Sequence, residues 1–237
     1  MNELRNNELK NNYEHVLSMI QDACKSGQRS PEEVTLIAVS KTYSADDIWI
    51  LYDLGCRHFG ENKVQELTQK QDILPKDIYW HMIGHLQTNK VKYLVGRVDM
   101  IHGVDSLKLA QEIQSKAQKE GIVQKILLEV NIAREDTKYG LVEEDVLDLI
   151  RMIHSFENIS IQGLMTIAPY VTNATENQKH FRKLKQLSVD IMRENIDNVI
   201  MNVLSMGMSG DYVVAIQEGA TMVRVGTGLF GKRNYNI

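Results

Sequence analysis

Eight short apolar segments alternate with segments of helical periodicity, and this alternation restricts the fold more than any other feature. We expect strands at 34–42, 57–60, 78–83, 98–104, 125–130, 159–167, 199–204 and 221–225, and a helix over 7–27 before the first strand. Strand–helix alternation builds parallel sheets covered by helices. The sequence therefore predicts an α/β fold, a single (β/α)8 TIM-type barrel with an extra N-terminal helix. An open doubly wound sheet is the competing arrangement.

Composition favours one domain in a reducing compartment. No linker-like tract interrupts the 237 residues, so we expect a single domain over residues 1–237. The net charge of −4 gives no electrostatic basis for a nucleic-acid or anionic-membrane partner. The polar amino terminus has no apolar signal core, and no apolar run reaches the ~20 residues of a membrane span. Cys24 and Cys56 lack metal-ligand spacing, so we expect buried free thiols and a cytoplasmic protein.

Lys41 stands at the end of the first apolar segment. Parallel α/β folds place their chemistry at the carboxyl ends of strands. Burial there disfavours the charged ammonium and lowers the pKa of the lysine, and a neutral amine is the form that makes a Schiff base. The alternative is that the side chain leaves the strand and extends into water.

Two glycine-containing loops follow the last two predicted strands, at 205–209 and 226–228. Glycine permits close backbone approach, serine offers hydroxyl groups, and a helix start presents unpaired N–H groups. Barrel enzymes often bind phosphate between the loops after these two strands. The loops therefore indicate a phosphate site, and two ordinary glycine turns are the alternative.

Arg224 is a lone arginine within the apolar run 222–225, so it needs a buried acceptor. That acceptor is either a structural carboxylate or a pyridine nitrogen, which the guanidinium would keep unprotonated. A lysine, a phosphate site and such an arginine together describe a site for pyridoxal phosphate. Asn62 and Asn131 either contact a ring substituent or tie loops together. His81 and His85 flank a strand end without suitable companions, so we expect no metal site.

Several motifs resemble those of the pyridoxal phosphate homeostasis protein family. They are AVSKT at 38–42, FGEN at 59–62, IGHLQTNK at 83–90, LSMGMS at 204–209 and VRVGT at 223–227. The resemblance spans nearly the whole chain. It departs at Tyr139, where many relatives carry serine or histidine, and this changes the expected shape of the site entrance.

The resemblance implies a barrel like the N-terminal domain of alanine racemase, with pyridoxal 5′-phosphate bound covalently to Lys41 as an aldimine. It further implies that Arg224 faces the pyridine nitrogen and that Asn62 lies near the ring. The implied phosphate-binding residues are Ser205, Ser209, Gly226 and Thr227.

The function implied by the resemblance is to bind this cofactor in its intracellular homeostasis without efficient catalytic turnover. We then expect no catalytic residues, a monomer, and apo forms of pyridoxal-phosphate enzymes as candidate recipients. The alternative is an amino-acid racemase, which needs a second acid/base from an added carboxyl-terminal domain. We expect that domain to be absent, because the chain ends ten residues after Thr227. A Schiff-base aldolase is disfavoured by Arg224, since it has no pyridine nitrogen to meet.

Overall fold

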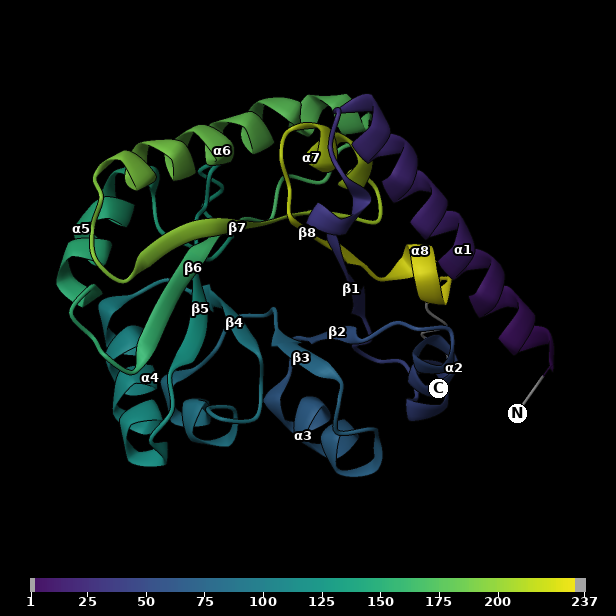
Figure 1. Ribbon diagram of the computed structural model, residues 1–237, viewed down its shortest axis with the longest axis horizontal. Helices are drawn as coiled ribbons and strands as arrows, with labels where there is room; N and C mark the ends of the chain where they lie inside the picture. The colour runs from purple at the N-terminus through teal and green to yellow at the C-terminus, as the bar shows by residue number, and fades with distance from the viewer. Residues whose placement is uncertain (1–2, 233–237) are drawn as a thin grey trace.

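A computed structural model describes residues 3–232 and shows a closed barrel of parallel strands in sequence order (Figure 1). The strands are β1 (Thr35–Val39), β2 (His58–Glu61), β3 (Tyr79–Met82), β4 (Met100–Val104), β5 (Gln124–Glu129), β6 (Ile159–Met165), β7 (Val199–Met208) and β8 (Met222–Val225). Pairing of β8 with β1 closes the barrel, so the predicted TIM-type fold is confirmed and the open sheet is wrong. The first two and last five residues of the predicted single domain lie outside the described residues.

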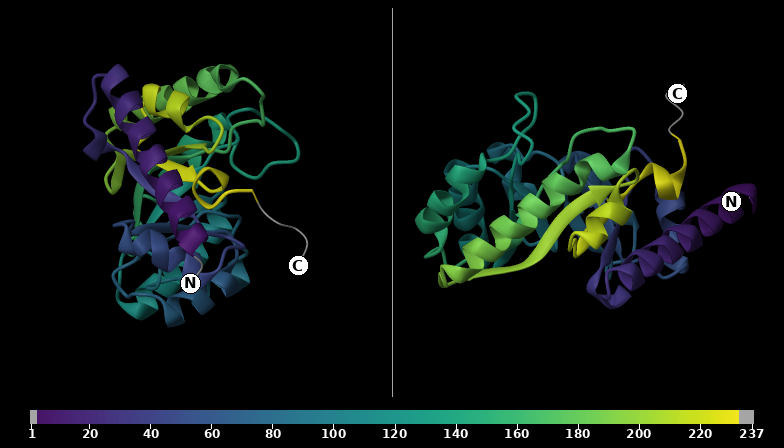
Figure 2. Two further views of the ribbon diagram at one scale, coloured as in Figure 1. Left: turned by 90° about the vertical axis from the view of Figure 1, so that its right-hand side faces the viewer. Right: turned by 90° about the horizontal axis from the view of Figure 1, so that it is seen from above.

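Helices surround the barrel and connect successive strands (Figures 1 and 2). They are α1 (Glu3–Ser26), α2 (Ala45–Asp53), α3 (Val64–Ile73), α4 (Leu107–Glu120), α5 (Glu143–Ile153), α6 (Gln178–Arg193), α7 (Tyr212–Gln217) and α8 (Thr227–Phe230). Short 3-10 helices are η1 (Pro31–Glu33), η2 (Thr88–Tyr93) and η3 (Ala174–Asn177). Within residues 3–232, none of these helices combines the length and apolarity that crossing a membrane requires.

The extra N-terminal helix α1 packs across α7 and α8, which follow the last two strands (Figure 2). Its buried residues Leu9, Tyr13, Val16 and Ile20 recur every three or four positions and form one apolar face. Asn12 Nδ2 donates to Leu229 O on α8 at 2.9 Å. The helix therefore braces the elements that follow β7 and β8, where the phosphate site is predicted.

Both cysteines are buried free thiols, as the sequence predicts. Cys24 ends the buried face of α1, and Cys56 lies between α2 and β2. Burial raises the pKa of the Cys56 thiol to about 12, which keeps it protonated and unreactive at neutral pH.

The barrel interior contains a small apolar cluster of Met100, Leu127 and Met165, separate from the larger core beneath the helices. Alternation along each strand directs one set of side chains to the helices and the other into the barrel. Gly163 is required where β6 meets β7, because a Cβ there would lie 1.8 Å from Val203 O. Polar side chains, among them His81, His102 and Arg224, are also buried.

Strand β7 is longer than predicted. It continues through Met208, whereas the sequence indicated a loop from residue 205. Ser205 pairs with Met222 and Met208 pairs with Arg224, with an irregularity between them where Gly207 adopts φ +91°. The glycine therefore bends a strand that stays paired to β8, and this places Ser209 beside the end of β8.

Candidate functional site

A cleft of about 640 Å³ opens at the carboxyl ends of the strands. Of the seven predicted site residues, the lining includes Lys41, Asn62, Ser209, Arg224, Gly226 and Thr227. Ser205 is completely buried and does not line the cleft. The topology thus brings together residues from β1, β2, β7 and β8 at one rim, as expected for a barrel whose strands all point the same way.

The backbone on both sides of Lys41 is held by helix α3. Ser40 O accepts a hydrogen bond from Lys70 Nζ at 2.8 Å, and Thr42 N donates to Glu66 Oε1 at 2.5 Å. Thr42 has φ +70°, a conformation that is unfavourable for a β-branched residue and must be enforced by its surroundings. The position of Lys41 at the rim is therefore fixed by contacts to its neighbours in the chain.

A buried ionic network lies behind Lys41. Lys70 Nζ contacts Glu61 Oε1 at 2.7 Å and Glu66 Oε1 at 2.7 Å, and Ser40 Oγ donates to Glu61 Oε1 at 2.6 Å. Burial raises the pKa of Glu61, and Lys70 opposes that rise. Sequence reasoning missed the structural role of Lys70, although Glu66 and Lys70 stand four apart on a helix, the spacing at which opposite charges meet.

Arg224 lies almost fully buried at the floor of the cleft. Its Nη1 donates to Ser205 Oγ at 2.7 Å and its Nη2 to Thr166 O at 2.8 Å. The acceptors are thus a hydroxyl and a carbonyl, and no carboxylate among residues 3–232 forms an ion pair with Arg224. Burial lowers the pKa of Arg224 to about 10, so the guanidinium is still charged at neutral pH and can donate into the cleft.

The loops after β7 and β8 are joined by the side chain of Ser209. Its Oγ accepts hydrogen bonds from Gly226 N at 3.1 Å and Gly228 N at 3.2 Å. The hydroxyl still has its own hydrogen to donate. Gly226, Thr227 and Ser209 all line the cleft, so backbone and hydroxyl donors gather at one end of it.

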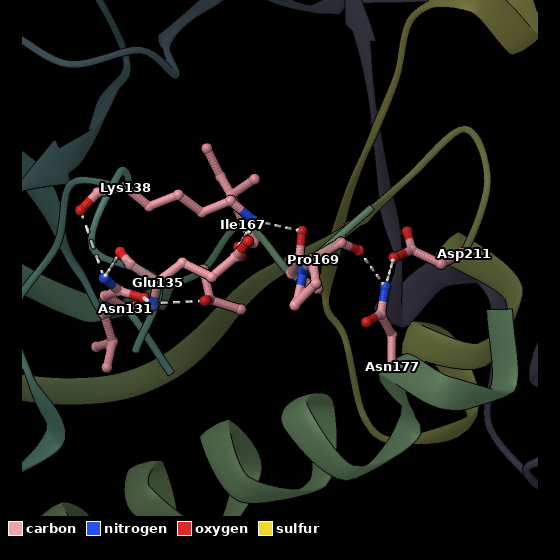
Figure 3. A network of polar contacts seen from close by, with 10 residues as sticks. Asn131, Glu135, Lys138, Ile167, Pro169, Asn177 and Asp211 are labelled. Atoms are coloured by element: carbon pink, nitrogen blue, oxygen red, sulfur yellow. Dashed lines mark hydrogen bonds and ion pairs between the residues drawn. The ribbon is translucent and has the colours of Figure 1, made fainter. Parts of the chain in front are cut away.

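One wall of the cleft is the segment after β6, and polar side chains hold it from both sides (Figure 3). Lys138 Nζ donates to Ala168 O at 3.0 Å and forms an ion pair with Glu135. On the other side Asn177 Nδ2 donates to Pro169 O at 2.9 Å and to Asp211 Oδ2 at 2.8 Å. The wall is therefore anchored to elements on both sides.

Asn131 ties a loop together, which decides between the two roles that the sequence left open. Its Nδ2 donates to Glu135 O at 2.9 Å and its Oδ1 accepts from Glu135 N at 3.1 Å (Figure 3). Tyr139, at which the chain departs from the family motif, is largely exposed and stacks on His85 with ring centroids 3.8 Å apart.

Glu129 is a buried carboxyl group that sequence reasoning also missed. It ends β5, and its Oε2 has no hydrogen-bond partner in the part of the chain that the structure describes. Burial, together with the charge of Asp105, raises the pKa of Glu129 to about 7, and Arg224 acts in the opposite direction. No local sequence pattern distinguishes a carboxyl group such as that of Glu129, which is buried at the end of a strand, from an exposed one.

Asn62 is packed directly against Gly84, and both line the cleft. A Cβ at Gly84 would lie 2.6 Å from Asn62 Cβ and 2.8 Å from Asn62 Cα. We expect Gly84→Ala to displace Asn62 and to weaken binding of pyridoxal 5′-phosphate, the cofactor that the sequence predicts, by about tenfold, the equivalent of ~1.4 kcal/mol. Spectral titration measures the dissociation constant. Gly27→Ala is the packing control, because Gly27 lies outside the cleft lining and an added Cβ there would lie 3.6 Å from its nearest neighbours, Ala23 O and Cys24 O. Equal binding by the Gly84→Ala variant and the unmodified protein would contradict a role for Asn62.

The barrel is that of the alanine racemase N-terminal domain family. The family described as "Alanine racemase, N-terminal domain" matches residues 10–234 of this chain. The solved structure of an unknown protein from Bifidobacterium adolescentis superposes with a TM-score of 0.92, is 34% identical, and covers 97% of each chain.

Other relatives carry names or ligands that refer to pyridoxal phosphate. The pyridoxal phosphate homeostasis protein of Aquifex aeolicus is 46% identical over 221 residues, covering 93% of this chain and 96% of the relative. PipY of Synechococcus elongatus, solved with pyridoxal phosphate bound, is 37% identical with a TM-score of 0.78, covering 90% of this chain and 100% of that chain. This chain belongs to the pyridoxal phosphate homeostasis protein family.

Proposed function

We propose that this protein binds pyridoxal 5′-phosphate through a Schiff-base bond to Lys41 and serves the homeostasis of that cofactor in the cytoplasm. The observation that carries the proposal is that Lys41, Arg224 and the Ser209 end of the cleft share one cavity. The naming of the relatives and the cofactor-bound PipY structure support it. Apo forms of pyridoxal-phosphate enzymes would be the recipients of the cofactor.

The donors lining the cleft fit the cofactor's chemical groups. Arg224 is a permanent donor and would keep the pyridine nitrogen unprotonated, which makes the ring a weaker electron sink. Ser209, Gly226 and Thr227 would hold the phosphate, with the hydroxyl and backbone N–H groups as donors. Asn62 would lie beside the ring. Ser205 would act on the phosphate only indirectly, because its hydroxyl is engaged beneath the cleft.

The state of the other ionisable groups on the lining supports a binding role. Glu135 and Lys138 are paired with each other, and Asp211 accepts hydrogen bonds from Asn177 and from Met208 N. Tyr170 is 95% exposed to solvent. Racemisation needs a second acid/base positioned opposite the lysine, and each of these lining groups is either engaged with another residue or exposed. We therefore propose a binding protein rather than a racemase.

Reduction and peptide mapping test the proposal. The purified protein should carry an absorption band of a lysine-bound aldehyde, and borohydride should trap the pyridoxyl group on Lys41. Lys41→Ala should lose the band, whereas Lys63→Ala, which changes an exposed lysine immediately before α3, should keep it. A pyridoxyl group found only on another lysine would refute the assignment. Rapid exchange of amino-acid α-protons with deuterated water, or racemisation, would favour the enzyme instead.

A further inference from the structure

A chain of hydrogen-bonded histidines crosses the barrel interior and ends at Arg224. His58 Nδ1 lies 3.0 Å from His81 Nε2, and His81 Nδ1 lies 3.0 Å from His102 Nε2. His102 Nδ1 lies 3.0 Å from Ser205 Oγ, which accepts from Arg224 Nη1 at 2.7 Å. The chain starts at the amino end of β2, passes through β3 and β4, and reaches β7 and β8 beneath the cleft.

Two hydrogen arrangements of this chain are possible, and one of them gives the serine hydrogen a partner. Arg224 can only donate, so Ser205 Oγ accepts from it and keeps a second lone pair and its own hydrogen. When Ser205 donates to His102 Nδ1, His102 carries its hydrogen on Nε2 and donates to His81 Nδ1, and His81 in turn donates from Nε2 to His58 Nδ1. In the reverse arrangement Ser205 accepts from both Arg224 and His102, and its hydrogen has no partner in the chain. We expect the first arrangement, because it uses the serine hydrogen.

The two inner histidines are held neutral by their surroundings. His81 and His102 are completely buried, and burial lowers the pKa of His81 to about 3. The pKa of His102 is lowered by burial and by the charges of His81 and Arg224. Glu129 and Asp211 face Arg224 and act to keep it charged. Neither His81 nor His102 therefore becomes positively charged near neutral pH.

His58 is the end of the chain that solvent can reach, because it is only half-buried. Its ring stacks on Tyr79, with centroids 4.8 Å apart, and Tyr79 is half-exposed. Burial lowers the pKa of His58; Asp99 raises it and Lys125 lowers it, and those two residues form an ion pair at 2.9 Å. A protonated His58 carries hydrogen on both nitrogens and can no longer accept from His81.

We propose that His58, His81 and His102 are positioning residues that orient Arg224 through Ser205. When His58 becomes protonated, the donor and acceptor roles along the chain are reversed, and this change reaches the cofactor ring. In the reversal each hydrogen moves one contact towards His58: from His81 Nε2 to His58 Nδ1, and from His102 Nε2 to His81 Nδ1. Ser205 Oγ passes its hydrogen to His102 Nδ1 and takes up one proton from solvent, so the chain gains one proton in all. His81 and His102 then carry hydrogen on Nδ1. Ser205 Oγ then accepts from both His102 and Arg224, and its own hydrogen turns away from the chain. This proposal rests on the proposed function only for its last step, since the chain itself belongs to the protein without cofactor.

Nitrogen-15 spectra of the histidine rings test the chain in the cofactor-free protein. Above neutral pH we expect hydrogen on Nε2 in His58, His81 and His102. As the pH falls below the usual histidine pKa of about 6.5, His58 should become charged, and the other two should change to Nδ1–H with the same midpoint. Hydrogen on Nδ1 of His102 at high pH, or inner histidines that ignore the His58 titration, would overturn the proposal.

His58→Gln separates acceptance from titration, because the amide oxygen can accept from His81 Nε2 but cannot be protonated near neutral pH. In this variant the inner histidines should keep hydrogen on Nε2 at every pH between about 5 and 8. Tyr79→Phe is the matched control, since it keeps the stacked ring beside His58 and should retain the titration.

The cofactor-loaded protein gives the second measurement. Its visible absorption should change with pH at the midpoint found for His58 in the unmodified protein and in Tyr79→Phe, and should be independent of that midpoint in His58→Gln. A spectrum that stays constant while the ring spectra show reversal would overturn the link to the cofactor. Failure to bind the cofactor at Lys41 would leave the ring spectra unaffected, so it counts against the proposed function alone.

Discussion

Replacing Lys70 with methionine should lower the free energy of unfolding by about 3–5 kcal/mol, the usual cost of removing one partner of a buried ion pair. Methionine has a similar length but no charge, so Glu61 would keep only Ser40 Oγ as a partner for its buried carboxylate. Ser40 O would also lose its side-chain donor and keep only Tyr43 N, and the backbone that positions Lys41 would loosen. Urea unfolding monitored by circular dichroism measures the change.

The pH dependence of this loss identifies its cause. Without Lys70 the folded-state pKa of Glu61 should rise further above its unfolded value, because burial then acts unopposed. Below the unfolded value of about 4.3, the group is protonated in both states and costs nothing. As pH rises from there towards the folded-state pKa, the folded state holds the extra proton and stability falls. The Lys70→Met variant should therefore be less stable near pH 8 than near about pH 5.

Two further variants control this experiment. Lys63→Met changes an exposed lysine immediately before α3 and should alter stability by less than about 0.5 kcal/mol. Adding Glu61→Gln to Lys70→Met removes the uncompensated charge, so the double variant should recover part of the loss and lose its pH dependence. A Lys70→Met protein as stable as the unmodified protein would mean that the network does not stabilise the fold.

The fold was predictable because the signals that specify it are local. Each strand is a short apolar run and each helix has its own periodicity, and parallel order then places all carboxyl ends at one rim. Lys41 could be placed at that rim for the same reason. The end of β7 could not be placed, because a glycine after an apolar run suits both a turn and a bent strand. Pairing of Met208 with Arg224 decides for the strand, and that pairing is a tertiary contact.

The interactions that hold the site are long-range, and sequence reasoning found few of them. From the sequence, we compared His81 with His85, four residues further on, and predicted that the two do not bind a metal ion. The structure instead pairs His81 with His58 and His102, which are 23 and 21 residues away. The available signal was that these residues lie on three successive strands with side chains facing the same way. This signal identifies a contact between the histidines only when the register between the strands is known.

Pyridoxal should bind at least about a hundredfold more weakly than pyridoxal 5′-phosphate, a difference of ~2.8 kcal/mol. Hydrogen bonds to a charged phosphate are worth ~1.5–3 kcal/mol each, and the Ser209 end of the cleft offers several donors. Spectral titration of the unmodified protein with each aldehyde gives the two dissociation constants. Equal affinities would mean that these loops do not hold phosphate.

Ser209→Ala locates the effect within the cleft. Ser209 Oγ accepts from Gly226 N and Gly228 N while its own hydrogen remains to be donated, so alanine removes a donor and also releases the two loops from each other. Binding of pyridoxal 5′-phosphate should weaken by about tenfold or more. Binding of pyridoxal should change by less than about threefold, because the contacts that we propose for it are to Lys41, Asn62 and Arg224. A similar loss for both aldehydes would show that Ser209 supports the shape of the cleft rather than the phosphate, since only the phosphate distinguishes the two ligands.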